Sequence, residues 1–89
     1  MASNGKVALV TGAGTGIGKS SVLQLLGDGY SVLLAGRRIE PLEETISEAG
    51  VDDSRAIAIP TDVGNPDSVA ALFEKAEATF GRLDVLFNN

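Results

Sequence analysis

The sequence predicts an α/β protein with a doubly wound parallel sheet, and three observations support this fold class. Short, uninterrupted apolar runs recur along the chain, and each is typical of a strand buried on both faces. Stretches with helical spacing of apolar residues separate these runs, which gives the order βαβαβαβ. Elements that alternate in this way form a parallel sheet with right-handed crossovers, and the expected spatial order of the strands is 3-2-1-4.

The first half of the chain contains two strands and two helices. Residues 7–10 (VALV) predict the first strand, and a glycine-rich loop separates it from a helix expected over about 17–26. Residues 32–35 (VLLA) predict the second strand. The second helix is expected over about 40–49, because Pro41 is tolerated in a first helical turn and a glycine follows the last helical position.

The second half adds two strands and one helix. Residues 56–59 (AIAI) predict the third strand, which the following proline is expected to stop. Asn65, followed by a proline and an acid, is a typical helix start, and apolar residues recur at helical spacing up to residue 80. Residues 83–87 (LDVLF) predict a fourth strand, apolar on both faces although it would be an edge strand. We therefore expect residues 1–89 to be the first part of one truncated domain, with a partner chain over this edge as the alternative.

The composition excludes several kinds of function. The net charge of −5 disfavours nucleic acid or an anionic membrane as the main partner. The chain has no cysteine and no histidine, so no metal site is expected and the usual general base is missing. The N-terminus has no signal-peptide pattern, and no apolar run approaches the ~20 residues that span a bilayer. We expect a cytoplasmic protein.

The glycine-rich loop between the first strand and the first helix is a candidate phosphate-binding site. A phosphate placed there would meet free backbone N–H groups and the positive end of the helix dipole. Gly12 permits the sharp turn out of the strand, Gly16 lets the backbone approach a pyrophosphate, and Gly18 lets the helix pack close to the strand. This pattern is typical of a Rossmann-type nucleotide-binding domain. The residues expected at the pyrophosphate are Gly12, Thr15, Gly16, Ile17 and Gly18.

A second motif overlaps the first and supports a rival hypothesis. Residues 13–20 (AGTGIGKS) nearly fit the P-loop pattern, with alanine in place of the first glycine. In a P-loop nucleoside triphosphatase or kinase, Lys19 would reach the β- and γ-phosphates and Ser20 would hold Mg²⁺. A Rossmann domain instead requires a ribose contact at the end of the second strand, about 20 residues further on. Arg37 and Arg38 stand there, which favours the Rossmann interpretation.

The residues after the second strand predict the coenzyme. An NAD site places a carboxylate at this position to bind the ribose 2′-hydroxyl, whereas an NADP site supplies arginine for the 2′-phosphate. No acid is present, and Arg37 and Arg38 follow the strand directly. An arginine fork can donate two parallel hydrogen bonds to a phosphate. We therefore predict NADP as the coenzyme and place Arg37 ahead of Arg38, with a solvated arginine pair as the alternative.

Together these residues resemble the short-chain dehydrogenase/reductase (SDR) family, over all 89 positions. The resemblance implies that Asp62 and Val63 contact the adenine and that Asn89 lies against the coenzyme ribose, although Asp62 alone could equally be a capping or loop carboxylate. Many NADP-preferring relatives have a basic residue where Thr15 stands, so NAD is kept as the second coenzyme. The family's Thr-Gly-x-x-x-Gly-x-Gly, Asp-Val and Asn-Asn motifs are matched by Thr11, Gly12, Gly16, Gly18, Asp62, Val63, Asn88 and Asn89.

The family's proton-transferring residues are not matched. They are a tyrosine four residues ahead of a lysine, a serine and a further asparagine, and no catalytic residue can be assigned in this chain. The only tyrosine, Tyr30, has Leu34 four residues on. The resemblance implies a parent enzyme that moves a hydride between NADP(H) and a small-molecule alcohol or carbonyl substrate, and that assembles as a homo-oligomer. A non-catalytic nucleotide sensor of the same fold would share every feature seen here, and remains the second alternative.

Overall fold

The computed structural model describes residues 5–14 and 16–88 and contains four parallel strands in the order β3-β2-β1-β4. This is the strand order that the sequence predicted. In chain order the elements are β1 (Val7–Thr11), α1 (Gly16–Gly27), β2 (Ser31–Gly36), α2 (Ile39–Ala49), the 3₁₀ turn η1 (Asp53–Arg55), β3 (Ala56–Pro60), α3 (Pro66–Phe80) and β4 (Val85–Phe87).

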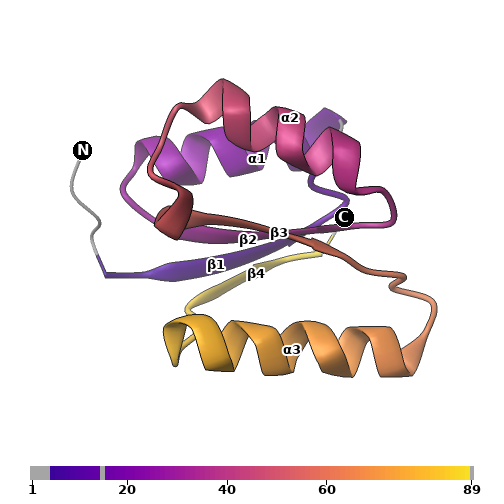
Figure 1. Ribbon diagram of the computed structural model, residues 1–89. Helices are drawn as coiled ribbons and strands as arrows, with labels where there is room; N and C mark the ends of the chain where they lie inside the picture. Colours follow the sequence, from indigo (N-terminus) through magenta and orange to yellow (C-terminus); the bar gives the residue numbers. More distant parts are fainter. Residues whose placement is uncertain (1–4, 15, 89) are drawn as a thin grey trace.

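The helices lie on both faces of the sheet. Figure 1 shows α1 and α2 together on one face and α3 alone on the other. Because α1 and α2 connect strands in the direction 1-2-3, and α3 returns the chain past β1 to β4, right-handed crossovers require these opposite faces. The described part of the chain is therefore a doubly wound, Rossmann-type α/β fold.

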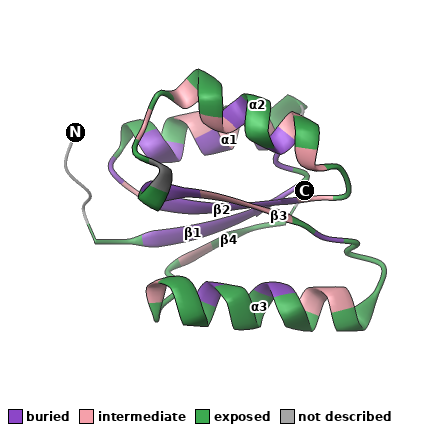
Figure 2. Ribbon diagram, in the orientation of Figure 1, coloured by how far each residue is buried: buried purple, intermediate pink, exposed green. Residues whose placement is uncertain are grey.

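Two apolar layers hold the helices to the sheet. The central strands β1 and β2 are buried at nearly every position (Figure 2). Their side chains alternate between the two layers. Towards α1 and α2 the layer is built from Ala8, Val10, Val22, Leu26, Val32, Leu34 and Leu42, among others. Towards α3 it is smaller and is built from Val7, Leu9, Leu33, Ala35, Leu72 and Ala76.

The α3 face is only partly covered. Among the described residues β4 pairs with β1 alone, and its apolar side chains stay accessible, with Leu86 51% and Phe87 40% exposed. Phe73 of α3 is also accessible, with 42% of its surface exposed. The apolar edge strand that the sequence predicted is therefore present. No helix among the described residues is long and apolar enough to cross a membrane.

Several strand boundaries differ from the prediction by one or two residues, and two of these differences have a structural cause. The fourth strand begins at Val85 and not at residue 83. Asp84, just before it, bonds to Val7 of β1 through its side chain as well as its backbone. Its backbone N–H donates to Val7 O (2.8 Å), and its carboxylate accepts the Val7 N–H (2.8 Å). Strand β3 includes Pro60, paired with Gly36, since an edge strand tolerates a proline.

Asp84 is also held by a neighbouring arginine. Arg82 donates from Nε to Asp84 Oδ2 (2.9 Å) and from Nη2 to Oδ1 (2.6 Å). The hydrogen bonds from Arg82 and from the Val7 backbone lower the pKa of the Asp84 carboxyl from its ordinary value of 3.8. This carboxylate therefore joins the start of β4 to the start of β1.

The predicted helix signals are confirmed for α3. The Asn65 side chain accepts hydrogen bonds from the backbone N–H groups of Asp67 (2.9 Å) and Ser68 (3.3 Å). At the other end Gly81 adopts a left-handed conformation (φ 71°) and its N–H donates to Glu77 O (2.9 Å). Both ends of α3 are therefore capped, which fixes the loop that leads into it from β3.

The end of α1 depends on a residue that the sequence did not single out. Arg55 is buried, and its Nη2 donates to Leu26 O (2.9 Å) and Tyr30 O (2.7 Å). Leu26 lies in the last turn of α1, where backbone carbonyls lack helical partners. Arg55 thus ties η1, before β3, to the turn between α1 and β2.

Candidate functional site

The residues of interest gather at one edge of the sheet. The four strands are parallel, so their carboxyl ends, marked by the arrowheads in Figure 1, lie along the same edge. Gly12 directly follows β1, Arg37 directly follows β2 and Asn88 directly follows β4. Asp62 is the second residue after the end of β3. The helices change face between β1 and β4. In open α/β sheets such a switch point is where ligands bind, beyond the carboxyl ends of the strands.

The glycine loop has the backbone geometry that the sequence predicted. Gly12 (φ 60°) and Gly16 (φ 57°) both adopt left-handed conformations that other residues rarely accept. Helix α1 begins at Gly16, so the N–H groups of its first turn have no partner within the helix. Gly18 is buried and the Ile17 side chain is 78% exposed. Thr15 lies outside the described residues.

The loop is held against the start of α2 at a glycine that the motif does not include. A Cβ atom on Gly14 would lie 2.6 Å from Pro41 Cβ and 3.3 Å from the Pro41 carbonyl carbon. The Ala13 N–H donates to Ala35 O (3.2 Å), which joins the same loop to the end of β2. Gly14 is therefore required by close packing. The only sequence signal for it was a third glycine within the loop.

The structure brings the glycine loop and both candidate arginines to one cavity. This cavity of about 210 Å³ has a floor of backbone and small side chains, because three of its seven lining residues are glycines. Arg37 and Arg38 are exposed and line the same cavity as the loop glycines, so the cavity has two cationic residues on one side. The lining residues are Gly12, Gly14, Gly36, Arg37, Arg38, Pro41 and Leu42.

The Asp62 side chain contacts one of these two arginines. Arg37 Nη2 donates to Asp62 Oδ1 (3.3 Å) across the ends of β2 and β3. The same oxygen accepts the Gly64 N–H (2.9 Å). Arg38 has a different partner, Glu40, whose Oε1 lies 3.7 Å from Arg38 Nε.

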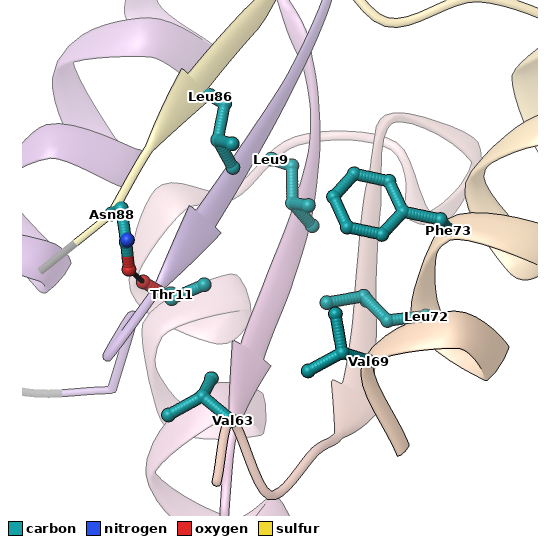
Figure 3. A pocket seen from close by; sticks show the side chains of 8 residues that line it. All are labelled: Leu9, Thr11, Val63, Val69, Leu72, Phe73, Leu86 and Asn88. Carbon is teal, nitrogen blue, oxygen red and sulfur yellow. Dashed lines mark hydrogen bonds between the residues drawn. The ribbon is translucent and has the colours of Figure 1, made fainter. Parts of the chain in front are cut away.

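Val63 faces another hollow, next to the first but on the α3 side of the sheet. This hollow of about 320 Å³ is mainly apolar, and Figure 3 shows Val63, Val69 and Phe73 around it. Its polar side chains are those of Thr11 and Asn88. Asp62 and Val63 are adjacent in sequence and have different surroundings. Asp62 contacts Arg37, whereas Val63 lines the hollow on the α3 side of the sheet.

Thr11 and Asn88 join the ends of β1 and β4. Thr11 Oγ1 lies 3.1 Å from Asn88 Oδ1 and 3.3 Å from Phe87 O, and its hydroxyl donates to these oxygens (Figure 3). Asn88 is thus tied to β1 beside the glycine loop. The expected ribose contact, Asn89, lies outside the described residues.

Comparison with known proteins identifies the family. A family model described as short chain dehydrogenase matches residues 6–89, which is nearly the whole chain. The chain belongs to the short-chain dehydrogenase family. Among curated proteins, the hydroxynaphthalene reductase-like protein Arp2 of Metarhizium robertsii is 44% identical over 86 residues, covering 96% of this chain and 32% of that protein. The chain thus spans about a third of the length of the curated relatives it matches.

Solved structures of short-chain dehydrogenases have the same arrangement. A short chain dehydrogenase from Bacillus anthracis superposes with a TM-score of 0.91 at 33% identity, covering 96% of this chain and 34% of that one. A 3-ketoacyl-(acyl-carrier-protein) reductase from Brucella melitensis, solved with NADH, gives 0.83 at 34% identity (92% and 33% covered). The C-domain of a bacterial malonyl-CoA reductase, solved with NADP, gives 0.85 at 30% identity (96% and 14% covered).

Within this short-chain dehydrogenase the P-loop interpretation finds no support. Lys19 Nζ forms an ion pair with the Glu48 carboxylate of α2, so the amine is engaged between two helices. Ser20 lies on an exposed part of α1. Both residues are therefore ordinary positions of the first helix, as the Rossmann interpretation expects.

Proposed function

We propose that this chain is the coenzyme-binding part of an NADP(H)-dependent oxidoreductase that acts on alcohol or carbonyl substrates. The observation that carries the choice of coenzyme is the position of Arg37 and Arg38. They follow β2 directly and line the same cavity as the glycine loop. A 2′-phosphate on the adenosine ribose would need cations at that position, and a site for the unphosphorylated coenzyme would place a carboxylate there.

The residues present fit a dinucleotide. The left-handed Gly12 and Gly16 bend the loop without Cβ atoms at these two positions, next to the first turn of α1, whose N–H groups have no partner within the helix. Open space surrounds the position where a Cβ atom on Gly16 would be, so the backbone there is accessible to a pyrophosphate. We assign Gly12, Thr15, Gly16, Ile17 and Gly18 to the pyrophosphate, Arg37 and Arg38 to the 2′-phosphate, Asp62 and Val63 to the adenine, and Asn89 to the ribose.

The chain's own part in the reaction is to bind and orient the coenzyme. When bound, the nicotinamide would supply or accept the hydride. The positive end of α1 and the loop N–H groups would fix the pyrophosphate, and thereby the distance from the adenosine end to the reacting end. We assign no part in proton transfer or substrate binding to any residue of this chain. We also propose that the whole enzyme acts on small-molecule alcohols or carbonyl compounds, assembles as a homo-oligomer and is cytoplasmic.

The proposal is tested by comparing the affinities of the chain for NADPH and NADH. The Arg37→Ala variant should weaken NADPH binding by about 10- to 100-fold, because hydrogen bonds to charged groups contribute about 1.5–3 kcal/mol, and should change NADH binding little. Lys75→Ala, on the exposed side of α3, removes the same charge away from the proposed site. It therefore controls for the effect of net charge on coenzyme affinity. Equal weakening of both coenzymes by Arg37→Ala would contradict the assignment of NADP(H).

A further inference from the structure

The ends of β2 and β3 bring Arg37 and Asp62 into contact. The Thr61 N–H donates to Gly36 O (2.6 Å), so the two strands stay paired up to their last residues. Arg37 and Asp62 each follow one of these two residues. Arg37 Nη2 then donates to Asp62 Oδ1 (3.3 Å), an ion pair whose side chains are 77% and 48% exposed. The contact therefore follows from the pairing of β2 with β3, whose connection along the chain runs through α2 and η1.

The carboxylate is the fixed partner of this pair. Asp62 Oδ1 accepts the Gly64 N–H (2.9 Å), and the Asp62 N–H donates to Ser68 Oγ (2.9 Å) in the first turn of α3. The Asn65 N–H donates to Asp62 O (3.0 Å), and Asn65 caps α3. Three hydrogen bonds thus hold Asp62 in a turn whose far side is a capped helix.

Arg37 is the less constrained partner, because its side chain is 77% exposed. Within residues 5–14 and 16–88, the structure gives its guanidinium no hydrogen bond other than the one to Asp62. An exposed arginine with four rotatable bonds samples many positions, and binding a phosphate would restrict it to few of them. Among the described residues, the Asp62 carboxylate is therefore the one side chain that holds the guanidinium of Arg37 by a hydrogen bond.

We propose that Asp62 is a positioning residue that holds Arg37 over the cavity beside the glycine loop and so favours coenzymes that carry a 2′-phosphate. This inference rests on the proposed function. Asp62 occupies only Nη2, and a guanidinium has five N–H donors, so an edge of the fork is left for the phosphate. The effect of Asp62 on NADPH passes through Arg37, whereas any contact of Asp62 with the adenine would affect NADPH and NADH alike.

The negative charge of Asp62 also opposes the bound phosphate, and the geometry decides which effect is larger. The attraction acts between atoms in contact at 3.3 Å. A phosphate that accepts hydrogen bonds from the other N–H groups of Arg37 would lie farther from the carboxylate than the guanidinium does. At an exposed site, water and salt weaken the longer-range repulsion more than the direct hydrogen-bonded contact. The net effect of Asp62 should therefore favour NADPH.

The test is a double-mutant cycle on the chain, followed by ¹⁵N–¹H NMR titration with NADPH and with NADH. Asp62→Asn removes the charge and keeps an amide oxygen that can accept the Gly64 N–H. We expect Asp62→Asn to lower the ratio of NADPH to NADH affinity by about threefold, the size typical of an exposed ion pair. In the Arg37→Ala background, Asp62→Asn should leave that ratio unchanged. The spectra themselves report whether each variant is folded.

Several outcomes would overturn the inference. If Asp62→Asn leaves the ratio of NADPH to NADH affinity unchanged, Asp62 only contacts the adenine or stabilises the turn. If Asp62→Asn increases this ratio, the carboxylate repels the 2′-phosphate. The same Asp62→Asn effect with and without Arg37 would show that it does not act through the arginine. If Arg37→Ala alone leaves the ratio unchanged, the proposed coenzyme is wrong as well. If neither coenzyme shifts any signal, the binding site itself is refuted.

Discussion

Gly14 and Pro41 are packed so closely that a Cβ atom on Gly14 would lie 2.6 Å from Pro41 Cβ. The loop that is assigned to the pyrophosphate therefore rests directly on the first turn of α2. Arg37 and Arg38 lie in the short connection between β2 and α2. The two ends of the proposed coenzyme site are thus linked by a packing contact as well as through the sheet.

Gly14→Ala should destabilise the protein and weaken coenzyme binding together. The added methyl group must displace Pro41 or the loop, and overpacking of this kind costs about 1–3 kcal/mol. Gly27→Ala is the matched control, because no atom lies within 4 Å of its added Cβ and alanine is the better helix former at the end of α1. Urea unfolding gives the free energy for both variants. A Gly14→Ala variant as stable as the wild type would mean that the contact can relax without cost.

Arg55→Met should lower the free energy of unfolding by about 2–4 kcal/mol, because buried carbonyl groups that accepted charge-assisted hydrogen bonds would lose their donor. The carbonyls concerned are those of Leu26 and Tyr30. Arg38→Met is the control, since the Arg38 side chain is 76% exposed and its contact with Glu40 is long. Thermal unfolding followed by circular dichroism compares the two. Equal stability of the two variants would show that Arg55 is not a structural anchor.

The stability conferred by Asp84 should depend on pH. Its pKa is lowered in the folded chain, so its contribution is fully present above the ordinary value of 3.8 and is lost as pH falls through the folded pKa. Asp84→Asn should therefore be less stable than the wild type at neutral pH, and the difference should shrink below about pH 4. Glu74→Gln makes the same charge change on the exposed side of α3. A difference in stability that is constant from pH 7 to pH 3 would contradict this role.

Local patterns in the sequence were sufficient for the order of the strands and α-helices, although they did not predict η1. Buried apolar runs predicted all four strands, and Asn65 predicted the start of α3. The left-handed bends at Gly12 and Gly16 also followed from residue type, because only glycine accepts them at low cost. Strand order followed from the doubly wound topology that is typical of alternating strands and helices with a glycine loop after the first strand. Each of these features depends on residues close together in the chain, or on a topology shared by many folds of this class.

The contacts that shape the candidate site were decided by the tertiary structure. Arg37 meets Asp62 across 25 residues, Arg55 reaches Leu26 across 29, and Gly14 meets Pro41 through the packing of the loop on α2. Residue type and periodicity contain no information about such pairs, because they depend on how far each strand extends and on how closely each helix packs. The amino-acid sequence by itself determined a parallel α/β sheet with a glycine loop and two arginines at one edge. Only the folded chain decided that a carboxylate stands beside one of those arginines, because the pairing of β2 with β3 places their ends next to each other.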